Sequence, residues 1–172
     1  LDGGQVGIGI ESTIVDFTEE VPIILRPGYI SLEMLRKELG EVRMDRGLLK
    51  EGDSARPKAP GMKYRHYAPK ADLTIVEGET EKVIAKINEL AQEAQEKGEQ
   101  IGIICTRETL SRYPNGIVKC TGSREEEESI ALHLYEVLRD FDKCQVTAIY
   151  SESFNTPRMG QAIMNRLLKA AG

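Results

Sequence analysis

Residues 71–172 alternate between short apolar runs and longer segments whose apolar residues recur at helical spacing. Four runs are typical of strands: "DLTIVEG", "QIGIICT", "GIVKCTG" and "VTAIYS". Between them, residues 80–97 predict one helix, and Ser123 with Glu126 forms a capping-box pattern for a second. Thr156 and Pro157 indicate the start of a last helix, with Ile163, Leu167 and Leu168 facing inward. This order predicts an α/β fold, a Rossmann-like three-layer sandwich with a mainly parallel sheet.

Residues 1–42 show a weaker pattern, with two short strand-like runs, "IESTIVDF" and "VPIILRPG". A turn and a helix follow in "PGYISLEMLRKELG", where Ser31 suits the N-cap and Gly40 the end. Two strands and one helix form too small a core to stand alone. We therefore expect this region to be the last part of a domain that begins before the sequence given.

Residues 43–70 predict a long linker, because Pro57, Pro60, Pro69 and Gly61 exclude a helix or a central strand. Within it, "MKYRHYAP" alternates cationic and aromatic residues, which an extended chain sends to opposite faces. Cations suit phosphates, and aromatic rings can stack on a purine. The alternative is a plain linker that its tyrosines hold between two domains.

Composition and charge narrow the class of protein. The formal net charge of −5 argues against a broad nucleic-acid-binding surface, because phosphate contacts need clustered Lys and Arg. Cys105, Cys120 and Cys144 are odd in number and form no CxxC pair, which predicts free thiols, a reducing compartment and no metal site. No apolar run is long enough for a membrane span, and we expect a cytoplasmic protein. The lone His133 is expected to be structural, and the acidic run at residues 125–128 to be solvated.

Ligand-binding signals are local. The first strand of the C-terminal region ends in "VEGETEKV", which has neither GxGxxG nor GxxxxGK[ST], so we expect no standard phosphate loop there. The glycines at positions 3, 4, 7 and 9 are consistent with simple turns or with a ligand cradle. Arg26 ends an apolar strand before Pro27 and Gly28, where a guanidinium suits a phosphate or carboxylate. A surface ion pair is the alternative for Arg26.

Four segments, in this order, resemble the C-terminal half of the two-domain L-threonylcarbamoyl-AMP synthases. They are "GIESTIVDF", "ILRPGYIS", "APGMKYRHYAP" and "GQAIMNRLLKAA". The resemblance covers essentially the whole chain. It implies residues 1–42 as the end of a YrdC-like catalytic domain, residues 43–70 as the linker and residues 71–172 as a Rossmann-like domain.

The resemblance also implies a nucleotidyltransferase. L-Threonine, bicarbonate and ATP, with Mg2+, would give threonylcarbamoyl-AMP and pyrophosphate, and downstream threonylcarbamoyl-transfer machinery would use the product to modify tRNA. Direct stable binding of tRNA by this chain is not expected. By position, Ser12 resembles the serine that contacts L-threonine, and Arg26 the arginine that binds the ATP phosphates. Tyr67 resembles the linker tyrosine at the nucleotide. The neighbours that would close the site as a lid are Lys63, Tyr64, Arg65 and His66.

The family's basic substrate-binding motif belongs to the N-terminal part of its catalytic domain and has no match here. No catalytic residue and no metal ligand is therefore assigned, and this chain alone is expected to be inactive. The alternative function is a non-catalytic regulatory module that binds a ligand or a partner through the linker.

Overall fold

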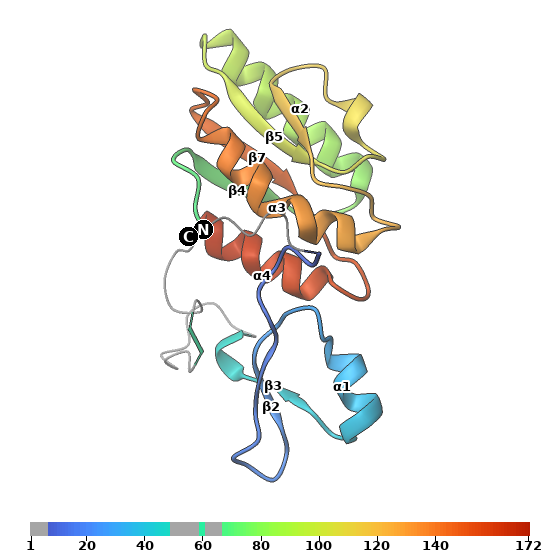
Figure 1. The fold of residues 1–172 in the computed structure, drawn as a ribbon. Coiled ribbons are helices and arrows are strands. Elements are labelled where there is room, and N and C mark those ends of the chain that lie inside the picture. Colours follow the sequence, from blue (N-terminus) through green and yellow to red (C-terminus); the bar gives the residue numbers. More distant parts are fainter. Residues whose placement is uncertain (1–6, 49–58, 61–66) are drawn as a thin grey trace.

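The chain folds around two separate sheets (Figure 1). A computed structural model describes residues 7–48, 59–60 and 67–172. The N-terminal elements are β1 (Ile14–Asp16), β2 (Ile23–Arg26), α1 (Leu32–Leu39), β3 (Arg43–Met44) and the 3-10 helix η1 (Arg46–Leu48). The C-terminal elements are β4 (Asp72–Val76), α2 (Thr80–Glu96), β5 (Ile101–Cys105), the 3-10 helix η2 (Leu110–Arg112), β6 (Ile117–Cys120), α3 (Glu127–Phe141), β7 (Ala148–Glu152) and α4 (Gly160–Ala171).

The C-terminal sheet is parallel throughout and has the strand order β4-β7-β5-β6. The last strand in the chain, β7, therefore lies between β4 and β5. Its residue Ile149 pairs with Leu73 on one side and with Gly102 on the other. The structure confirms the predicted parallel α/β sandwich, whose strand order the sequence did not specify.

Helices cover both faces of this sheet, and β5 shows how the two faces are packed. All five residues of β5 are buried. Ile101 and Ile103 belong to the apolar cluster with α2, whereas Ile104 belongs to the cluster with α3 and α4. This division follows from the alternation of side chains along a strand. Gly102 faces the ring of Phe141 so closely that a Cβ there would overlap it, which lets α3 approach the sheet.

The N-terminal sheet is smaller and mixed. β1 pairs with β2 in antiparallel fashion, and β3 pairs with β2 in parallel. The sheet thus extends to Met44, whereas we expected the linker to begin at residue 43. Helix α1 begins and ends as predicted, since the Ser31 hydroxyl accepts from the backbone N–H of Met34 at 3.2 Å and Gly40 follows with a φ of 80°.

The predicted capping box at the start of α3 is wrong. The helix begins at Glu127, and Ser123 lies outside it. The Ser123 hydroxyl instead donates to the Glu108 carboxylate at 2.5 Å and accepts from the backbone N–H of Glu125 at 3.2 Å. A charged acceptor from the connection between β5 and β6 has replaced the local helix cap.

The start of α4 also differs from the prediction, for a tertiary reason. The helix begins at Gly160, after a turn that contains Pro157. The carboxylate of Glu127 accepts from the backbone N–H groups of Arg158 and Met159 just before this helix. The acidic run at residues 125–128 is therefore not wholly solvated, because Glu127 is buried at a neighbouring helix end.

Three smaller predictions have clear outcomes. Leu168 was expected to face inward with Leu167 but is 43% exposed, so that part of the prediction is wrong. The three cysteines are free thiols, one buried and two half-buried, as predicted. His133 places Nδ1 2.7 Å from the carbonyl oxygen of Ser129 within α3, as a structural histidine would.

Over the described residues, no helix has the length and apolar character needed to cross a membrane.

Candidate functional site

Arg26, at the end of β2, gathers three neutral oxygens from two separate segments. Its Nε donates to the carbonyl oxygen of Ser12 at 3.0 Å, and Nη2 donates to the Ser12 hydroxyl at 3.1 Å. Its Nη1 donates to the carbonyl oxygen of Pro60 in the linker at 3.2 Å. Within the described part of the chain, no carboxylate pairs with Arg26, so a surface ion pair does not account for its position.

The backbone that carries Ser12 is held closely by the turn after β2. A Cβ at Gly28 would overlap the backbone of Glu11, Ser12 and Thr13, so only glycine fits there. The Thr13 hydroxyl also donates to the carbonyl oxygen of Ile30 at 2.9 Å. The pattern "LRPG" therefore does two things: it presents the Arg26 guanidinium and lets the Ser12 segment lie against the turn.

Glu11 connects the same segment to the C-terminal helices. Its Oε2 accepts from the Tyr135 hydroxyl of α3 at 2.6 Å and lies 2.8 Å from Nε of Arg166 on α4. Two residues earlier, Gly9 lies so close to the backbone of Ala131 and Leu132 in α3 that a Cβ would overlap it. Residues 9–12 thus lie between the N-terminal sheet on one side and helices α3 and α4 on the other.

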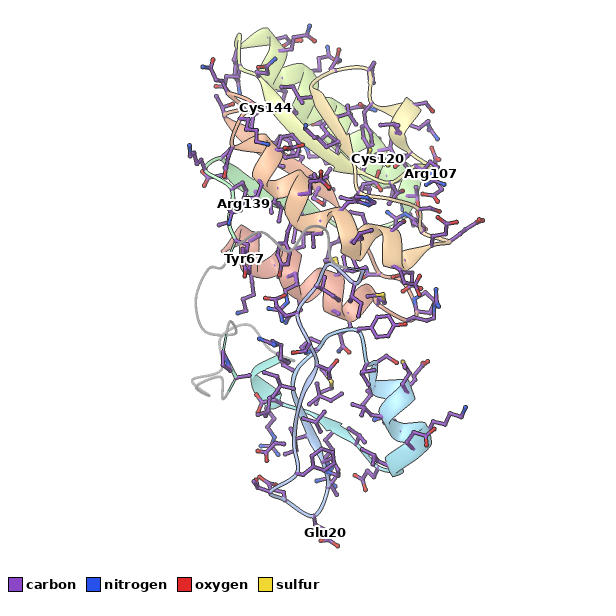
Figure 2. All side chains as sticks on the ribbon, viewed as in Figure 1. Glu20, Tyr67, Arg107, Cys120, Arg139 and Cys144 are labelled. Carbon is purple, nitrogen blue, oxygen red and sulfur yellow. The ribbon has the colours of Figure 1, made fainter. Side chains whose placement is uncertain are left out.

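Tyr67, the last residue of "KYRHY", reaches this cluster from the linker. Its ring packs on that of Tyr135, with centroids 4.5 Å apart and planes tilted by 45°. Figure 2 shows Tyr67 next to the C-terminal helices. Its φ of 57° is an unusual conformation for a residue with a side chain. Burial, together with the hydrogen bond to Glu11, raises the pKa of Tyr135, so its hydroxyl remains a donor near neutral pH.

The structure therefore brings Ser12 and Arg26 into direct contact and connects Tyr67 to them through Tyr135 and Glu11. The other predicted lid residues lie outside the described residues: Lys63, Tyr64, Arg65 and His66. The sequence analysis missed Glu11, Tyr135 and Arg166. Arg166 had one available signal, because it lies on the inward face of α4 with Ile163 and Leu167.

A cleft of about 640 Å3 lies between the N-terminal sheet and helix α4. Pro27, Met44 and Leu48 line one side, and residues of α4 and the turn before it line the other. The lining residues that the structure describes carry no charge. A lining without charge does not suit a triphosphate, so the described residues of this cleft give no support for binding of the ATP phosphates there.

A smaller cavity of about 210 Å3 lies at the carboxyl ends of β4 and β7. Among its lining residues, the buried Glu152 accepts from the Tyr113 hydroxyl at 2.7 Å and from Arg124 at 2.8 Å. In the described residues, no three or more His, Cys, Asp or Glu side chains are grouped so as to hold a metal ion.

The comparisons with known proteins all point to one family. The family described as "Threonylcarbamoyl-AMP synthase, C-terminal domain" matches residues 30–172. Proteins named threonylcarbamoyl-AMP synthase from Bacillus subtilis and Pyrococcus abyssi are each 43% identical to the chain. Each match covers 100% of this chain and 48% of the relative. A protein of the same name from Schizosaccharomyces pombe is 36% identical, with 99% of this chain and 44% of that protein covered.

A solved structure agrees with the sequence matches. It is the crystal structure of P. abyssi Sua5 complexed with L-threonine, which is 40% identical to this chain with a TM-score of 0.86. The match covers 99% of this chain and 48% of that one. The chain thus spans about half the length of the relatives it matches.

Proposed function

This chain belongs to the threonylcarbamoyl-AMP synthase family, whose C-terminal domain matches its residues 30–172, and from that premise we propose that it forms the C-terminal half of such an enzyme. The enzyme would be a nucleotidyltransferase that converts L-threonine, bicarbonate and ATP to threonylcarbamoyl-AMP and pyrophosphate. The product would supply the tRNA modification N6-threonylcarbamoyladenosine through downstream transfer machinery in the cytoplasm. The names of the relatives and the L-threonine complex of the P. abyssi protein support this proposal.

The observation that carries the proposal is the contact between Arg26 and Ser12. Arg26 donates to neutral oxygens in the described structure. A phosphate oxygen is a stronger, charged acceptor, so ATP would compete well for this guanidinium. If Nη2 leaves the Ser12 hydroxyl for a phosphate, that hydroxyl becomes available to L-threonine. One arginine and one serine would then bind the two substrates side by side.

The linker would serve as a lid over the nucleotide. Two contacts support this role: Pro60 accepts a hydrogen bond from Arg26, and Tyr67 packs on Tyr135 next to Glu11. Tyr67 would close over ATP, with Lys63, Tyr64, Arg65 and His66 as its neighbours in the lid. Closing such a site excludes water, and the lid must open again to release product.

The proposed division of the chain is unchanged in outline. Residues 1–42 would complete a YrdC-like catalytic domain, residues 43–70 the linker and residues 71–172 a separate Rossmann-like domain. The separation into two sheets supports it, as does the absence of any buried residue in α1. The pairing of β3 with β2 suggests that the first domain extends a few residues further, to Met44.

Mg2+ would accompany ATP in this reaction, because Mg2+ in such sites is bound mainly by substrate phosphates with one or two carboxylates. The described residues offer no group of three or more His, Cys, Asp or Glu side chains that could hold a metal ion. We therefore assign no residue of this chain to Mg2+.

The test uses the full-length protein and steady-state formation of threonylcarbamoyl-AMP, with each substrate varied in turn. Arg26→Ala should raise the KM for ATP by about ten- to a hundredfold, which corresponds to one charge-assisted hydrogen bond. Ser12→Ala should raise the KM for L-threonine more than that for ATP. Arg139→Ala, at an exposed position of α3, is the matched control and should leave both values unchanged.

Equal effects of both substitutions on both substrates would refute the assigned roles. A full-length protein that makes no product would favour the alternative of a non-catalytic regulatory module.

A further inference from the structure

We propose that Tyr135 of α3 and Arg166 of α4 are positioning residues for the proposed reaction, acting on Ser12 through Glu11 and on the linker through Tyr67. This inference rests on the proposed function and extends it to residues of the C-terminal domain. The C-terminal domain would then help to arrange the substrate site and would not only be joined to the domain that contains it.

The first step is that one carboxylate oxygen joins three elements. Oε2 of Glu11 accepts from the Tyr135 hydroxyl at 2.6 Å and lies 2.8 Å from Nε of Arg166. Glu11 directly precedes Ser12 in the chain. Because adjacent residues share a planar peptide unit, fixing Glu11 restricts the position of the Ser12 backbone, from which the hydroxyl projects.

The second step is that Arg166 cannot leave this position at low cost. Its side chain is only 2% exposed and lies on the inward face of α4. None of its three guanidinium nitrogens makes a hydrogen bond of normal geometry to a described residue, and Glu11 is the one carboxylate there that forms an ion pair with it, 2.8 Å from Nε. Separating a buried guanidinium from its single counter-charge is costly, because it leaves an uncompensated charge in the interior. Glu11 is therefore fixed by a helix of the C-terminal domain.

The third step is that Tyr135 has two faces with different partners. Its hydroxyl binds Glu11, while its ring packs on Tyr67 of the linker. A movement of Tyr67 away from this ring, as lid opening requires, exposes Tyr135 and removes packing from the group that holds Glu11. We infer that closure of the linker and alignment of Ser12 are energetically coupled through Tyr135.

The fourth step is that Ser12 receives restraints from both sides. Arg26 binds its carbonyl oxygen and hydroxyl from the N-terminal sheet, and Gly28 lies against its backbone. Glu11 binds α3 and α4 from the other side. Loss of the Glu11 contacts with α3 and α4 should leave the Arg26 contacts in place but increase the conformational freedom of the Ser12 segment. The expected signature is weaker binding of L-threonine at a nearly unchanged kcat.

The kinetic experiment compares two substitutions of Tyr135 in the full-length protein. Tyr135→Phe keeps the ring that packs on Tyr67 and removes only the donor to Glu11. We expect it to raise the KM for L-threonine by about five- to tenfold, which is less than the loss of a full hydrogen bond to a charged group would give. The KM for ATP should stay unchanged. Tyr135→Leu, which also removes the ring, should raise the KM for ATP as well.

Two controls separate positioning from general loss of structure. Tyr150→Phe removes a hydroxyl from β7 for which the described structure shows no hydrogen bond, and should change neither KM. Tyr135→Phe combined with Glu11→Gln should cost little more than Glu11→Gln alone, because the neutral side chain has already lost the charged acceptor of the Tyr135 hydroxyl. Independent, additive losses that lower kcat rather than raise KM would overturn the proposal in favour of a merely structural role.

A second measurement does not depend on activity. Hydrogen exchange on the 172-residue chain should be faster at residues 9–13 in Tyr135→Phe than in the parent chain, and unchanged in Tyr150→Phe. Should Tyr135→Phe not fold, Arg166→Lys serves the same purpose, with the same expected result. Unchanged exchange at residues 9–13 together with an unchanged KM for L-threonine overturns the inference. If the parent full-length protein makes no threonylcarbamoyl-AMP, the proposed function fails, and exchange alone then decides whether the network holds residues 9–13.

Discussion

The two sheets differ in how completely their side chains are covered. In the C-terminal unit, apolar clusters fill both faces of a parallel sheet, and β5 is buried along its whole length. In the N-terminal unit, Ile24 is the one fully buried residue of β1, β2 and β3, and α1 has none. The large exposed apolar residues of this unit are Ile8, Phe17, Tyr29, Ile30, Met34 and Leu39.

This difference separates a domain with its own core from a group of elements that lacks one. Burial of apolar surface supplies most of the stabilisation in folding, and a sheet with one face uncovered gains only part of it. The matched relatives are about twice as long as this chain. We expect the exposed apolar side chains of α1 and of Phe17, just after β1, to be covered by the rest of a longer protein. The C-terminal unit should need no such cover.

The largest expected effect comes from matched leucine substitutions in the two units. Leu134→Ala, at a fully buried position of α3, should lower the free energy of unfolding by about 3–4 kcal/mol, because it leaves a cavity in the core. Leu39→Ala, at a position of α1 that is 44% exposed, should change it by less than about 0.5 kcal/mol. Urea unfolding of the 172-residue chain measures both.

Leu168→Ala serves as the control within the C-terminal unit, since Leu168 is exposed on the same helix as the buried Leu167. Its cost should resemble that of Leu39→Ala. If Leu39→Ala is as damaging as Leu134→Ala, the N-terminal unit has a core of its own and the comparison fails.

A second effect concerns local opening. Amide hydrogens of β5 and β7 should exchange about a hundredfold more slowly than those of β1 and β2 in the isolated chain, because strands with little buried contact open more readily. Hydrogen exchange followed by mass spectrometry resolves these segments. A dilution series tests whether pairing between copies protects β1 and β2. Equal protection of all four strands at the lowest concentration would contradict the expectation.

The smallest effect concerns a carboxylate of the C-terminal unit. Partial burial opposes ionisation of Glu108, but hydrogen bonds from Ser123 and from the backbone of Arg124 outweigh it and lower its pKa to about 2. Its folded pKa thus lies below the unfolded value of about 4.3, so its stabilisation is present above that pH and is lost as the pH falls towards 2. Because Glu108 is largely exposed, we expect at most about 1 kcal/mol.

Urea unfolding of the parent chain and of Glu108→Gln at pH 6 and pH 3 tests this. The difference between the two proteins should be larger at pH 6 and should shrink at pH 3. Glu20→Gln, at an exposed turn of the N-terminal unit, is the control and should change nothing at either pH. A difference that grows at pH 3 would mean that the hydrogen bonds favour the neutral form of Glu108.

The local pattern of the sequence predicted the type of most elements, because each depended on neighbours in the chain. Helix α1 has its own cap at Ser31, and β5 is a continuous apolar run. Predictions failed where a distant group intervened. The Ser123 hydroxyl donates to Glu108 instead of capping α3, and the Glu127 carboxylate accepts from the backbone N–H of Arg158 just before α4. Strand order also depends on packing between distant segments, and no local pattern encodes it.

The same division applies to the candidate site. The end of its strand already marked Arg26 as a binder of phosphate or carboxylate, and the resemblance added Ser12 and the roles of both residues. Their contact agrees with the antiparallel pairing of β1 with β2. Glu11, Tyr135 and Arg166 come from three segments far apart in the sequence. Their meeting depends on how α3 and α4 pack against the first segment, which local patterns do not specify. The one sign in the sequence was Arg166, an arginine on the otherwise apolar inward face of α4, which indicated a buried partner for its charge.

The position of β7 has a consequence for synthesis of the chain on the ribosome. Among the strands that the structure describes, β4 has only β7 as a neighbour, and β5 also pairs with β7. Neither strand can therefore complete its ladder until residues 148–152 have emerged. A nascent chain that stops earlier would present unpaired edges on β4 and β5, which are ready templates for pairing with other chains. The completed parallel sheet is thus a late event of translation, and premature termination before β7 should yield an aggregating product rather than a smaller folded one.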